Sequence, residues 1–280
     1  MHSSVVLSVE RLTIRPAAEG GTAAGRGGAL RDVSFNISAG SFTALAGLNG
    51  SGKSTLAKAI AGLLAPSEGE IRLKEGASVG IVLQHPDTQL IGDTVMEEIA
   101  LCAKCGDSLT EAEMRETAET VLRGAGLFVP PDTPVARLSG GEKQLLNVAC
   151  CLAAQADIAV FDEAASMLDP ASRERVLKAA LAMCGKGTAV LWITHRMEEL
   201  VRAHRVLALE QGRLVFDGTA AEFFYGRAAG LPSPCEKLGM EPPLVVQVVR
   251  QLEKKGVRLD AWPLLPEELG EAVKEYADLR

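Results

Sequence analysis

A loop of small residues early in the chain has the composition of an anion-binding site. Residues 47–55, GLNGSGKST, fit the pattern G-x-x-x-x-G-K-[ST] and lie between an apolar run and an amphipathic one. Glycines let successive backbone N–H groups point at one anion, and the following helix adds its positive N-terminal end. Lys53 is suited to the β- and γ-phosphates, Ser54 to Mg²⁺ and Thr55 to the α-phosphate. The predicted phosphate-binding residues are Gly47, Asn49, Gly50, Ser51, Gly52, Lys53, Ser54 and Thr55.

Two acidic residues end a second apolar run, IAVFDEA, at residues 158–164. Ligands of open α/β sheets bind at the carboxyl ends of the strands, which is where Asp162 and Glu163 would lie. Asp162 suits a Mg²⁺ site through a water molecule, and Glu163 suits a general base that activates the attacking water. A strand that simply ends in solvated acids is the alternative, and the glycine loop makes it less attractive.

Two further polar residues end apolar strands. His195 follows LWIT, and its strand end would face the same ligand edge, within reach of a γ-phosphate. Gln84 ends VGIVLQ and is suited to contact both the metal and the water. The alternatives are a structural histidine and an ordinary surface strand end. Together, Glu163, His195 and Gln84 are the predicted catalytic residues, and Ser54, Gln84 and Asp162 the predicted metal-site residues.

The elements that must position these residues alternate between buried strands and helices, which favours a parallel sheet in an α/β core. We predict strands at 5–14, 30–38, 41–47, 69–74, 77–84, 158–164 and 187–194, with a hairpin over 205–218 that turns at Gln211–Gly212. Helices are predicted over 52–64, 93–105, 110–126, 139–155, 170–184 and 197–203. The Gly-rich segment 17–29 predicts a flexible surface hairpin or loop. After residue 224 a Pro- and Gly-rich linker is followed by two predicted helices.

Composition sets the class of the molecule. The chain has 280 residues, of which 47% are hydrophobic and 4% aromatic, so it is long enough for a sizeable aliphatic core. The net charge of -7 argues against non-specific nucleic-acid binding, which needs a basic face. No apolar run approaches the roughly 20 residues of a membrane span, and the N-terminus lacks a signal-peptide pattern.

The six cysteines do not show the paired spacing of a zinc site. Cys102 and Cys105 form a C-x-x-C within a predicted helix, which leaves a redox or metal role open. Reduced thiols used as small hydrophobic side chains are the favoured interpretation.

A second glycine motif completes the resemblance to a known family. LSGGEKQ, residues 138–144, occurs with the glycine loop, VFDEA, SMLDP and THR in an order that resembles the ATP-binding-cassette (ABC) ATPases over residues 5–220. The resemblance implies an α/β P-loop NTPase (RecA-like) core with an antiparallel β subdomain, an α-helical signature subdomain and a small C-terminal helical unit. The implied domains are a nucleotide-binding domain at 1–224, with its helical subdomain at about 86–155, a linker at 225–240 and a C-terminal dimerisation unit at 241–280.

The same resemblance implies ATP and Mg²⁺ as ligands and a second ABC ATPase chain, identical or related, as partner. Two cassettes face each other in that family, and the signature loop of one covers the ATP held by the other. Asp169 would lie in the D-loop that joins the two sites. The implied signature residues, which contact the partner's ATP, are Ser139, Gly140, Gly141 and Glu142.

Finer features are similar to the ATPases of energy-coupling-factor (ECF) transporters. These are a second glutamine after Gln84, here Gln89, and the tail from GMEPPLVV to EAVKEY. This resemblance implies import of a vitamin or transition-metal ion. It also implies an integral membrane scaffold, a small substrate-capture membrane protein, no nucleic acid, and a peripheral location on the cytoplasmic face of the membrane. Acidic residues after Gln84 are suited to a basic scaffold surface, or merely to the helix dipole.

Some positions depart from the family pattern. No aromatic precedes Phe35 to stack on adenine, so Arg15 or Pro16 would face the base, and Leu145 and Glu142 replace the usual arginine and glutamine of the signature. Three alternatives remain: an ATPase of another ABC transporter class, a soluble cassette acting on DNA or ribosomes, and a cassette that binds ATP only as structural glue beside an active partner.

Overall fold

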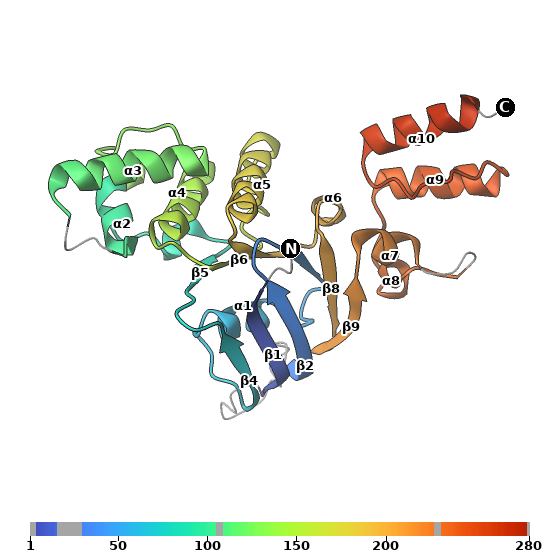
Figure 1. Ribbon diagram of the computed structural model, residues 1–280, viewed down its shortest axis with the longest axis horizontal. Coiled ribbons are helices and arrows are strands. Elements are labelled where there is room, and N and C mark those ends of the chain that lie inside the picture. Colours follow the sequence, from blue (N-terminus) through green and yellow to red (C-terminus); the bar gives the residue numbers. More distant parts are fainter. Residues whose placement is uncertain (1–3, 16–29, 105–108, 227–230, 279–280) are drawn as a thin grey trace.

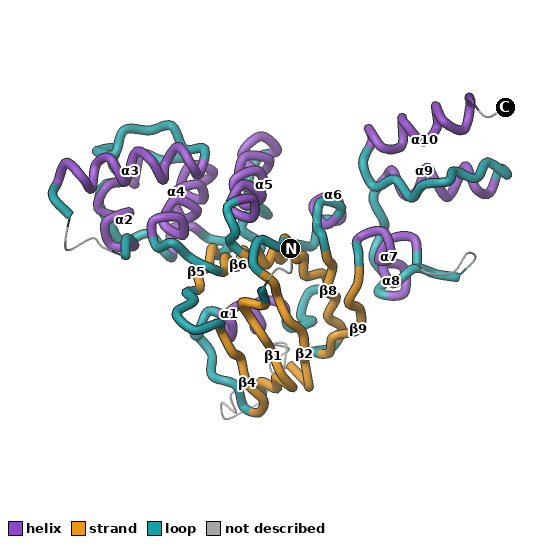
Figure 2. Tube along the Cα trace, in the orientation of Figure 1, coloured by secondary structure: helices purple, strands orange, loops and turns teal. Residues whose placement is uncertain are grey.

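The computed structural model describes residues 4–15, 30–104, 109–226 and 231–278. Its strands form a three-stranded antiparallel sheet of order β2-β1-β4 and a six-stranded sheet of order β5-β6-β7-β3-β8-β9, in which β9 alone is antiparallel to its neighbour (Figures 1 and 2). The strands are β1 (Val5–Ile14), β2 (Leu30–Ser38), β3 (Phe42–Ala46), β4 (Glu68–Leu73), β5 (Val79–Val82), β6 (Ile158–Asp162), β7 (Ala189–Ile193), β8 (Arg205–Glu210) and β9 (Arg213–Gly218). The predicted α/β class with a parallel core sheet is confirmed.

The six-stranded sheet is covered on both faces, which explains why its central strands are apolar throughout. Side chains alternate between the faces, as on any strand. Phe42, Phe161 and Trp192 point to one face and pack against each other, with ring centroids 5.0 and 5.8 Å from Trp192. Leu45 and Leu191 point to the other face. The residues that follow these strands are therefore held on a rigid platform.

Helix α1 (Lys53–Ile60) packs between the two sheets. Its buried residues Leu56, Ala57 and Ile60 share a core with strands β1 and β2 and with the near face of the six-stranded sheet. The antiparallel sheet lies at the bottom of Figure 1, beneath α1. The predicted loop at 17–29 lies outside the described residues.

A helical layer covers the far face of the large sheet. It comprises α2 (Val95–Cys102), α3 (Glu111–Ala125), α4 (Gly140–Ala153) and α5 (Pro170–Gly185). Capping boxes begin α2, α3 and α4, at Thr94, Thr110 and Ser139. Gly126 ends α3 in the left-handed conformation, at the predicted stop.

The C-terminal part forms a helical lobe on the right of Figure 1, and its buried residues Phe223, Phe224 and Cys235 belong to the same apolar core as the far face of the large sheet. The lobe follows α6 (Met197–Leu200) and strands β8 and β9 in the chain. It contains α7 (Ala220–Tyr225), α8 (Pro234–Lys237), α9 (Leu244–Lys254) and α10 (Pro266–Asp278). The segment predicted as a linker includes α8, where Cys235 is fully buried. Arg250 of α9 donates to the carbonyl oxygen of Phe224, and the Tyr225 hydroxyl donates to that of Pro263. These bonds join α9 and the segment before α10 to α7, and the predicted domain boundaries stay a prediction.

Candidate functional site

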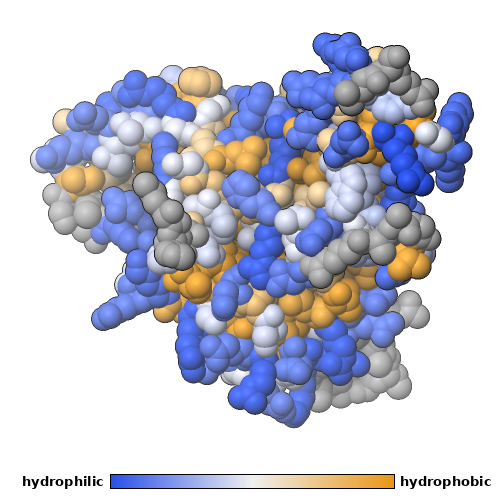
Figure 3. Space-filling view, turned by 45° about the vertical axis from the view of Figure 1, so that its right-hand side comes forward, coloured by the Kyte–Doolittle hydropathy of each residue, from blue (hydrophilic) through white to orange (hydrophobic). Residues whose placement is uncertain are grey.

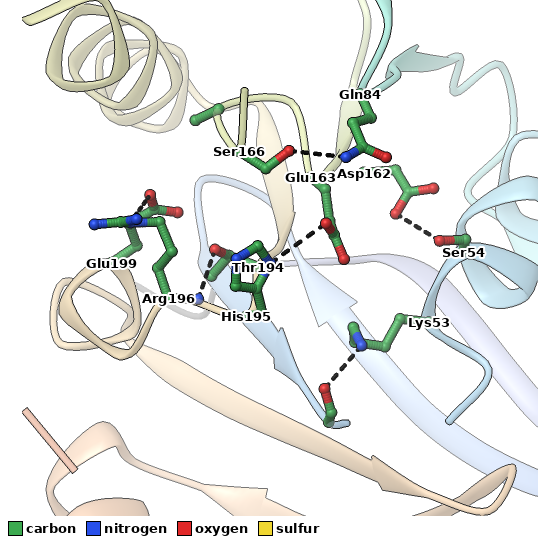
Figure 4. A network of polar contacts seen from close by, with 12 residues as sticks. Lys53, Ser54, Gln84, Asp162, Glu163, Ser166, Thr194, His195, Arg196 and Glu199 are labelled. Atoms are coloured by element: carbon green, nitrogen blue, oxygen red, sulfur yellow. Dashed lines mark hydrogen bonds and ion pairs between the residues drawn. The ribbon is translucent and has the colours of Figure 1, made fainter. Parts of the chain in front are cut away.

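A cleft of about 960 Å³ opens between the glycine loop and the C-terminal lobe. Polar residues cover most of the face shown in Figure 3, with apolar residues gathered in a band across its middle. Figure 4 shows the labelled side chains of Lys53, Asp162, Glu163 and His195 close together at the ends of β3, β6 and β7. The cleft is lined by Gly47, Leu48, Asn49, Glu163, His195, Arg196, Met197, Glu198, Met240, Glu241, Pro242, Leu244 and Gln247.

The glycine loop needs its glycines at particular positions. Gly47 has φ 148°, and a Cβ built there would lie 2.5 Å from both the Leu209 carbonyl oxygen and Ser51 Oγ. Gly52, with φ 109°, begins α1 without a side-chain cap, so the helix presents its first N–H groups to the loop. Ser51 Oγ is buried and has no hydrogen-bond partner in the part of the chain that the structure describes. An uncapped helix end beside an unpaired hydroxyl suits an anion.

Lys53 lies inside the loop rather than in solvent. Its side chain is buried, and Nζ donates to the carbonyl oxygens of Gly47 at 2.8 Å and Leu48 at 3.1 Å. Burial lowers the pKa of Lys53, whereas the nearby carboxylates of Glu163 and Asp162 act in the opposite direction. The ammonium group is therefore placed next to the loop centre, where a phosphate would need it.

Ser54, Asp162 and Gln84 supply the oxygen atoms of the predicted metal site. Ser54 Oγ donates to Asp162 Oδ1 at 3.0 Å, and burial raises the pKa of Asp162. Gln84 Nε2 donates to Ser166 Oγ at 3.1 Å, which leaves the side-chain carbonyl oxygen of Gln84 directed into the site (Figure 4). Hydroxyl, carboxylate and amide oxygens are the ligands that Mg²⁺ prefers.

Glu163 and His195 lie side by side in the lining of the cleft. His195 Nδ1 lies 3.4 Å from Glu163 Oε2, and the exposed fractions of the two side chains are 51% and 19%. Glu163 has φ 51°, a left-handed conformation that is uncommon for a residue with a side chain, and its N–H donates to the Ile193 carbonyl oxygen. Strain of this kind concentrates at functional positions. Thr194 Oγ1 accepts from Arg196 N–H and shapes the turn that carries His195.

The predicted signature residues do not line this cleft. Ser139 and Gly140 are exposed at the start of α4, and Ser139 and Glu142 form its capping box. Gly141 packs so closely on α5 that a Cβ would lie 2.4 Å from Ser172 Oγ. Asp169 caps α5 by accepting from Ala171 N–H and Ser172 N–H. Signature and D-loop are thus joined through Ser172, apart from the glycine loop of their own chain.

Two glutamines, Gln89 and Gln144, form hydrogen bonds with the backbone around Gln84. Only Gln89 was singled out from the sequence. Gln89 Oε1 accepts from Leu83 N–H at 2.7 Å, and its Nε2 donates to the Ile81 carbonyl oxygen. Gln144 is fully buried on α4, and its Nε2 donates to the carbonyl oxygens of Leu83 at 2.8 Å and Gln84 at 3.2 Å. Gln144 belongs to the signature motif, and no role was expected for it. Its polar side chain on the apolar side of the helix could have indicated one.

We expect Gln144→Ala to slow ATP hydrolysis by about tenfold, because small displacements of a positioning residue such as Gln84 are costly. ATP affinity should be unchanged, since Gln144 does not contact the glycine loop. Steady-state ATPase assays and nucleotide titrations measure the two quantities. Lys143→Ala is the control, because Lys143 is next to Gln144 on α4 but pairs with the exposed Asp87. An equal loss in both variants, or wild-type hydrolysis by Gln144→Ala, would contradict this role.

The acidic residues after Gln84 are mostly engaged within the chain. Glu98 is buried, and its Oε2 accepts from Ile91 N–H and Gly92 N–H. Glu97 completes the capping box of α2, and Asp87 pairs with Lys143. This favours the structural alternative over a basic docking partner.

The surface expected to face adenine is only partly described. Arg15 pairs with Glu68 on β4 and is exposed, whereas Pro16 lies outside the described residues.

Comparison with known proteins gives consistent matches. Residues 30–166 match the family model described as ABC transporter. The energy-coupling factor transporter ATP-binding protein EcfA1 of Halalkalibacterium halodurans is 34% identical over 259 residues, covering 88% of this chain and 91% of the relative. The corresponding protein of Lacticaseibacillus paracasei is 37% identical over 82% of this chain and 85% of its own length.

A solved structure is also similar over nearly the whole chain. It is cbiO1 from Clostridium perfringens, described as part of the ABC transporter complex cbiONQ. The TM-score is 0.69 at 27% identity, and the match covers 90% of this chain and 97% of that one.

Proposed function

Because the chain belongs to the ABC transporter family, among the energy-coupling factor transporter ATP-binding proteins, we propose that its cleft hydrolyses ATP to drive uptake of a micronutrient. The chain is an ABC-type ATPase. The cargo, a vitamin or a transition-metal ion, would be captured by a separate membrane subunit. The observation that carries the proposal is the meeting of the glycine loop, Glu163 and His195 in one cleft.

The glycine loop holds the phosphates in this proposal. Backbone N–H groups of residues 47–55 and the start of α1 surround them, and Lys53 neutralises the β- and γ-phosphates. The buried and unpaired Ser51 Oγ supports this role, because an anion in the loop would satisfy it.

Glu163 orients the attacking water and accepts its proton, and His195 contacts the γ-phosphate. The 3.4 Å separation of His195 Nδ1 and Glu163 Oε2 keeps both groups at the same end of the nucleotide. Gln84 lies beside Ser166 and near Asp162 in Figure 4, where it would contact the water and the metal site. Hydrolysis by positioned groups of this kind needs little covalent chemistry from the protein.

The oxygen atoms of Ser54, Gln84 and Asp162 fit a Mg²⁺ ion. The Ser54–Asp162 hydrogen bond keeps two of these oxygens together, and a cation would favour the charged form of the buried Asp162 carboxyl group. Bound Mg²⁺ would withdraw charge from the phosphates during transfer.

A second ABC ATPase chain completes each site. Ser139 and Gly140 are exposed and outside the cleft of their own chain, which supports their contact with ATP held by a partner. Asp169 then lies between the two sites. Both an identical chain and a related one fit this arrangement.

The membrane components are an integral scaffold and a small substrate-capture protein. Ile91, in the segment between Gln84 and α2, and Leu101, on α2, are exposed to 83% and 66%, and such apolar side chains suit a protein surface that covers them. No helix among the described residues is long and apolar enough to cross a membrane. In this proposal the membrane partners hold the chain peripherally, on the cytoplasmic face.

An affinity pull-down of this chain from detergent-solubilised membranes tests the proposal, with mass spectrometry of the co-purified proteins. We expect a second cassette with one larger and one small membrane protein, and the small one points to the cargo. Two large permease subunits would indicate another ABC transporter class, and no membrane protein at all a soluble ATPase. Steady-state hydrolysis by the purified complex separates an active ATPase from a cassette that only binds ATP.

A further inference from the structure

Two thiols and one carboxylate meet between helices α2 and α4. Glu98 and Cys102 lie one turn apart on α2, so they share a face of that helix. Cys150 reaches them from α4. One potential ligand atom from each of the three residues lies within 4.8 Å of the other two. In the part of the chain that the structure describes, no other group of three such residues meets this condition.

The cluster is enclosed on most sides. Glu98 and Cys150 are exposed to only 4% and 8%, whereas Cys102 is half-buried and leaves one approach from solvent. The Glu98 carboxylate is fixed, because Oε2 accepts from Ile91 N–H at 2.7 Å and from Gly92 N–H at 2.6 Å. Hydrogen bonds of this kind orient carboxylate ligands in metal sites.

The spacing is close to that of a tetrahedral metal site. With metal–sulfur bonds of about 2.3 Å, two thiolate ligands lie about 3.8 Å apart. The ligand atoms lie within 4.8 Å of one another, so the two sulfur atoms would have to approach each other by at most about 1 Å. Rotation of the side chains supplies such a movement. Two sulfur ligands and one oxygen select a thiophilic divalent ion over Mg²⁺, and the open side at Cys102 leaves room for a water as the fourth ligand.

The two thiols already interact. A hydrogen bond from Cys150 lowers the pKa of Cys102, and the same bond, with burial, raises the pKa of Cys150. Cys102 is the more accessible of the two thiols. Metal binding would release the protons that the thiols carry.

We propose that Glu98, Cys102 and Cys150 form a binding site for a thiophilic divalent cation such as Zn²⁺. The ion ties α2 to the signature helix α4, which also carries Gln144 and its hydrogen bonds to Leu83 and Gln84. Among the described residues, the thiol beside Cys102 is that of Cys150; Cys105 of the C-x-x-C lies outside the described residues.

Titration of the full-length chain with Co²⁺ tests the site, after removal of metals and in the presence of a reductant that contains no thiol. We expect one Co²⁺ per chain to give a thiolate-to-metal charge-transfer band in the near ultraviolet, and Zn²⁺ to abolish it. The Mg²⁺ site has only oxygen ligands, so Co²⁺ bound there gives no such band. Zn²⁺ should also raise the Tm of the wild-type chain.

Variants assign the ligands. Cys102→Ala and Cys150→Ala should each weaken binding by about 10²-fold or more, and Glu98→Gln by about tenfold with the thiolate band retained. Cys151→Ala is the matched control, because its thiol is adjacent in sequence but packs on Gly80 of β5. Half-buried Cys102 tolerates substitution, so its variant carries the test if Cys150→Ala does not fold.

Three results would overturn the proposal. The first is the absence of a thiolate band in the wild-type chain, and the second is an unchanged band in Cys102→Ala. The third is a Cys102–Cys150 disulfide that persists under the reductant, detected as the loss of two hydrogen masses. A Zn²⁺-induced rise in Tm that is equal in wild type and Cys102→Ala would assign the stabilisation to another site and contradict this one.

Discussion

Glu163→Gln is expected to slow steady-state ATP hydrolysis by about 10²- to 10⁴-fold, the usual contribution of a general base. The amide keeps the size of the side chain and its place beside His195, but it cannot accept the proton of the attacking water. ATP binding should be retained, because the glycine loop and Lys53 are untouched. The two measurements are phosphate release under saturating ATP and a nucleotide-binding titration.

Glu198→Gln is the matched control for this substitution. Glu198 lies on α6, exposed at the rim of the same cleft, so the same chemical change is made without removing a base. Hydrolysis by Glu198→Gln should stay at the wild-type level. Near wild-type turnover in Glu163→Gln would remove Glu163 from the role of base, and a parallel loss of ATP binding would point to a structural effect instead.

Lys53→Ala should impair both binding and hydrolysis. A charge-assisted hydrogen bond contributes about 1.5–3 kcal/mol, so ATP affinity is expected to fall by about 10- to 10²-fold. Loss of positive charge at the transferred phosphoryl group should slow turnover by a further factor of about 10² to 10³. Binding titrations and ATPase assays at several ATP concentrations separate the two effects.

Two variants sharpen the Lys53 experiment. Lys58→Ala removes an exposed lysine from the same helix and should leave binding close to wild type. Lys53→Arg keeps the charge but puts a larger, planar group into a buried position, so it should not restore activity. Wild-type ATP affinity in Lys53→Ala would show that the phosphates bind elsewhere.

The site residues that could be predicted from the sequence are those whose positions are set by the course of the backbone. Glycines, a lysine and acids at the ends of apolar strands have positions set by the strand order, since parallel strands end at one edge. For this reason Lys53, Glu163 and His195 were expected near each other, and the structure brings them together. Their individual roles are still proposals.

The other contacts depend on where side chains point and on where helices cross. The spacing of residues in the sequence gives neither. Gln144 lies 60 residues from Gln84 and reaches its carbonyl oxygen only because α4 crosses beneath β5. Cys102 likewise lies close to Cys150 of another helix, and no spacing pattern links these two residues. In neither case does the local pattern identify the partner.

The order of strands in the central sheet matters for how the chain is synthesised. Strand β3 is complete before the glycine loop begins, but its two neighbours follow about 150 residues later, since Phe42 pairs with Val190 and Thr43 with Arg205. At about 5–20 residues per second, a ribosome needs about 8–30 s to produce them. During that interval an apolar strand, fully buried in the finished sheet, has neither neighbour. The loop at its end is therefore translated well before its supporting strands, and it gains its final support only when β7 and β8 have left the ribosome.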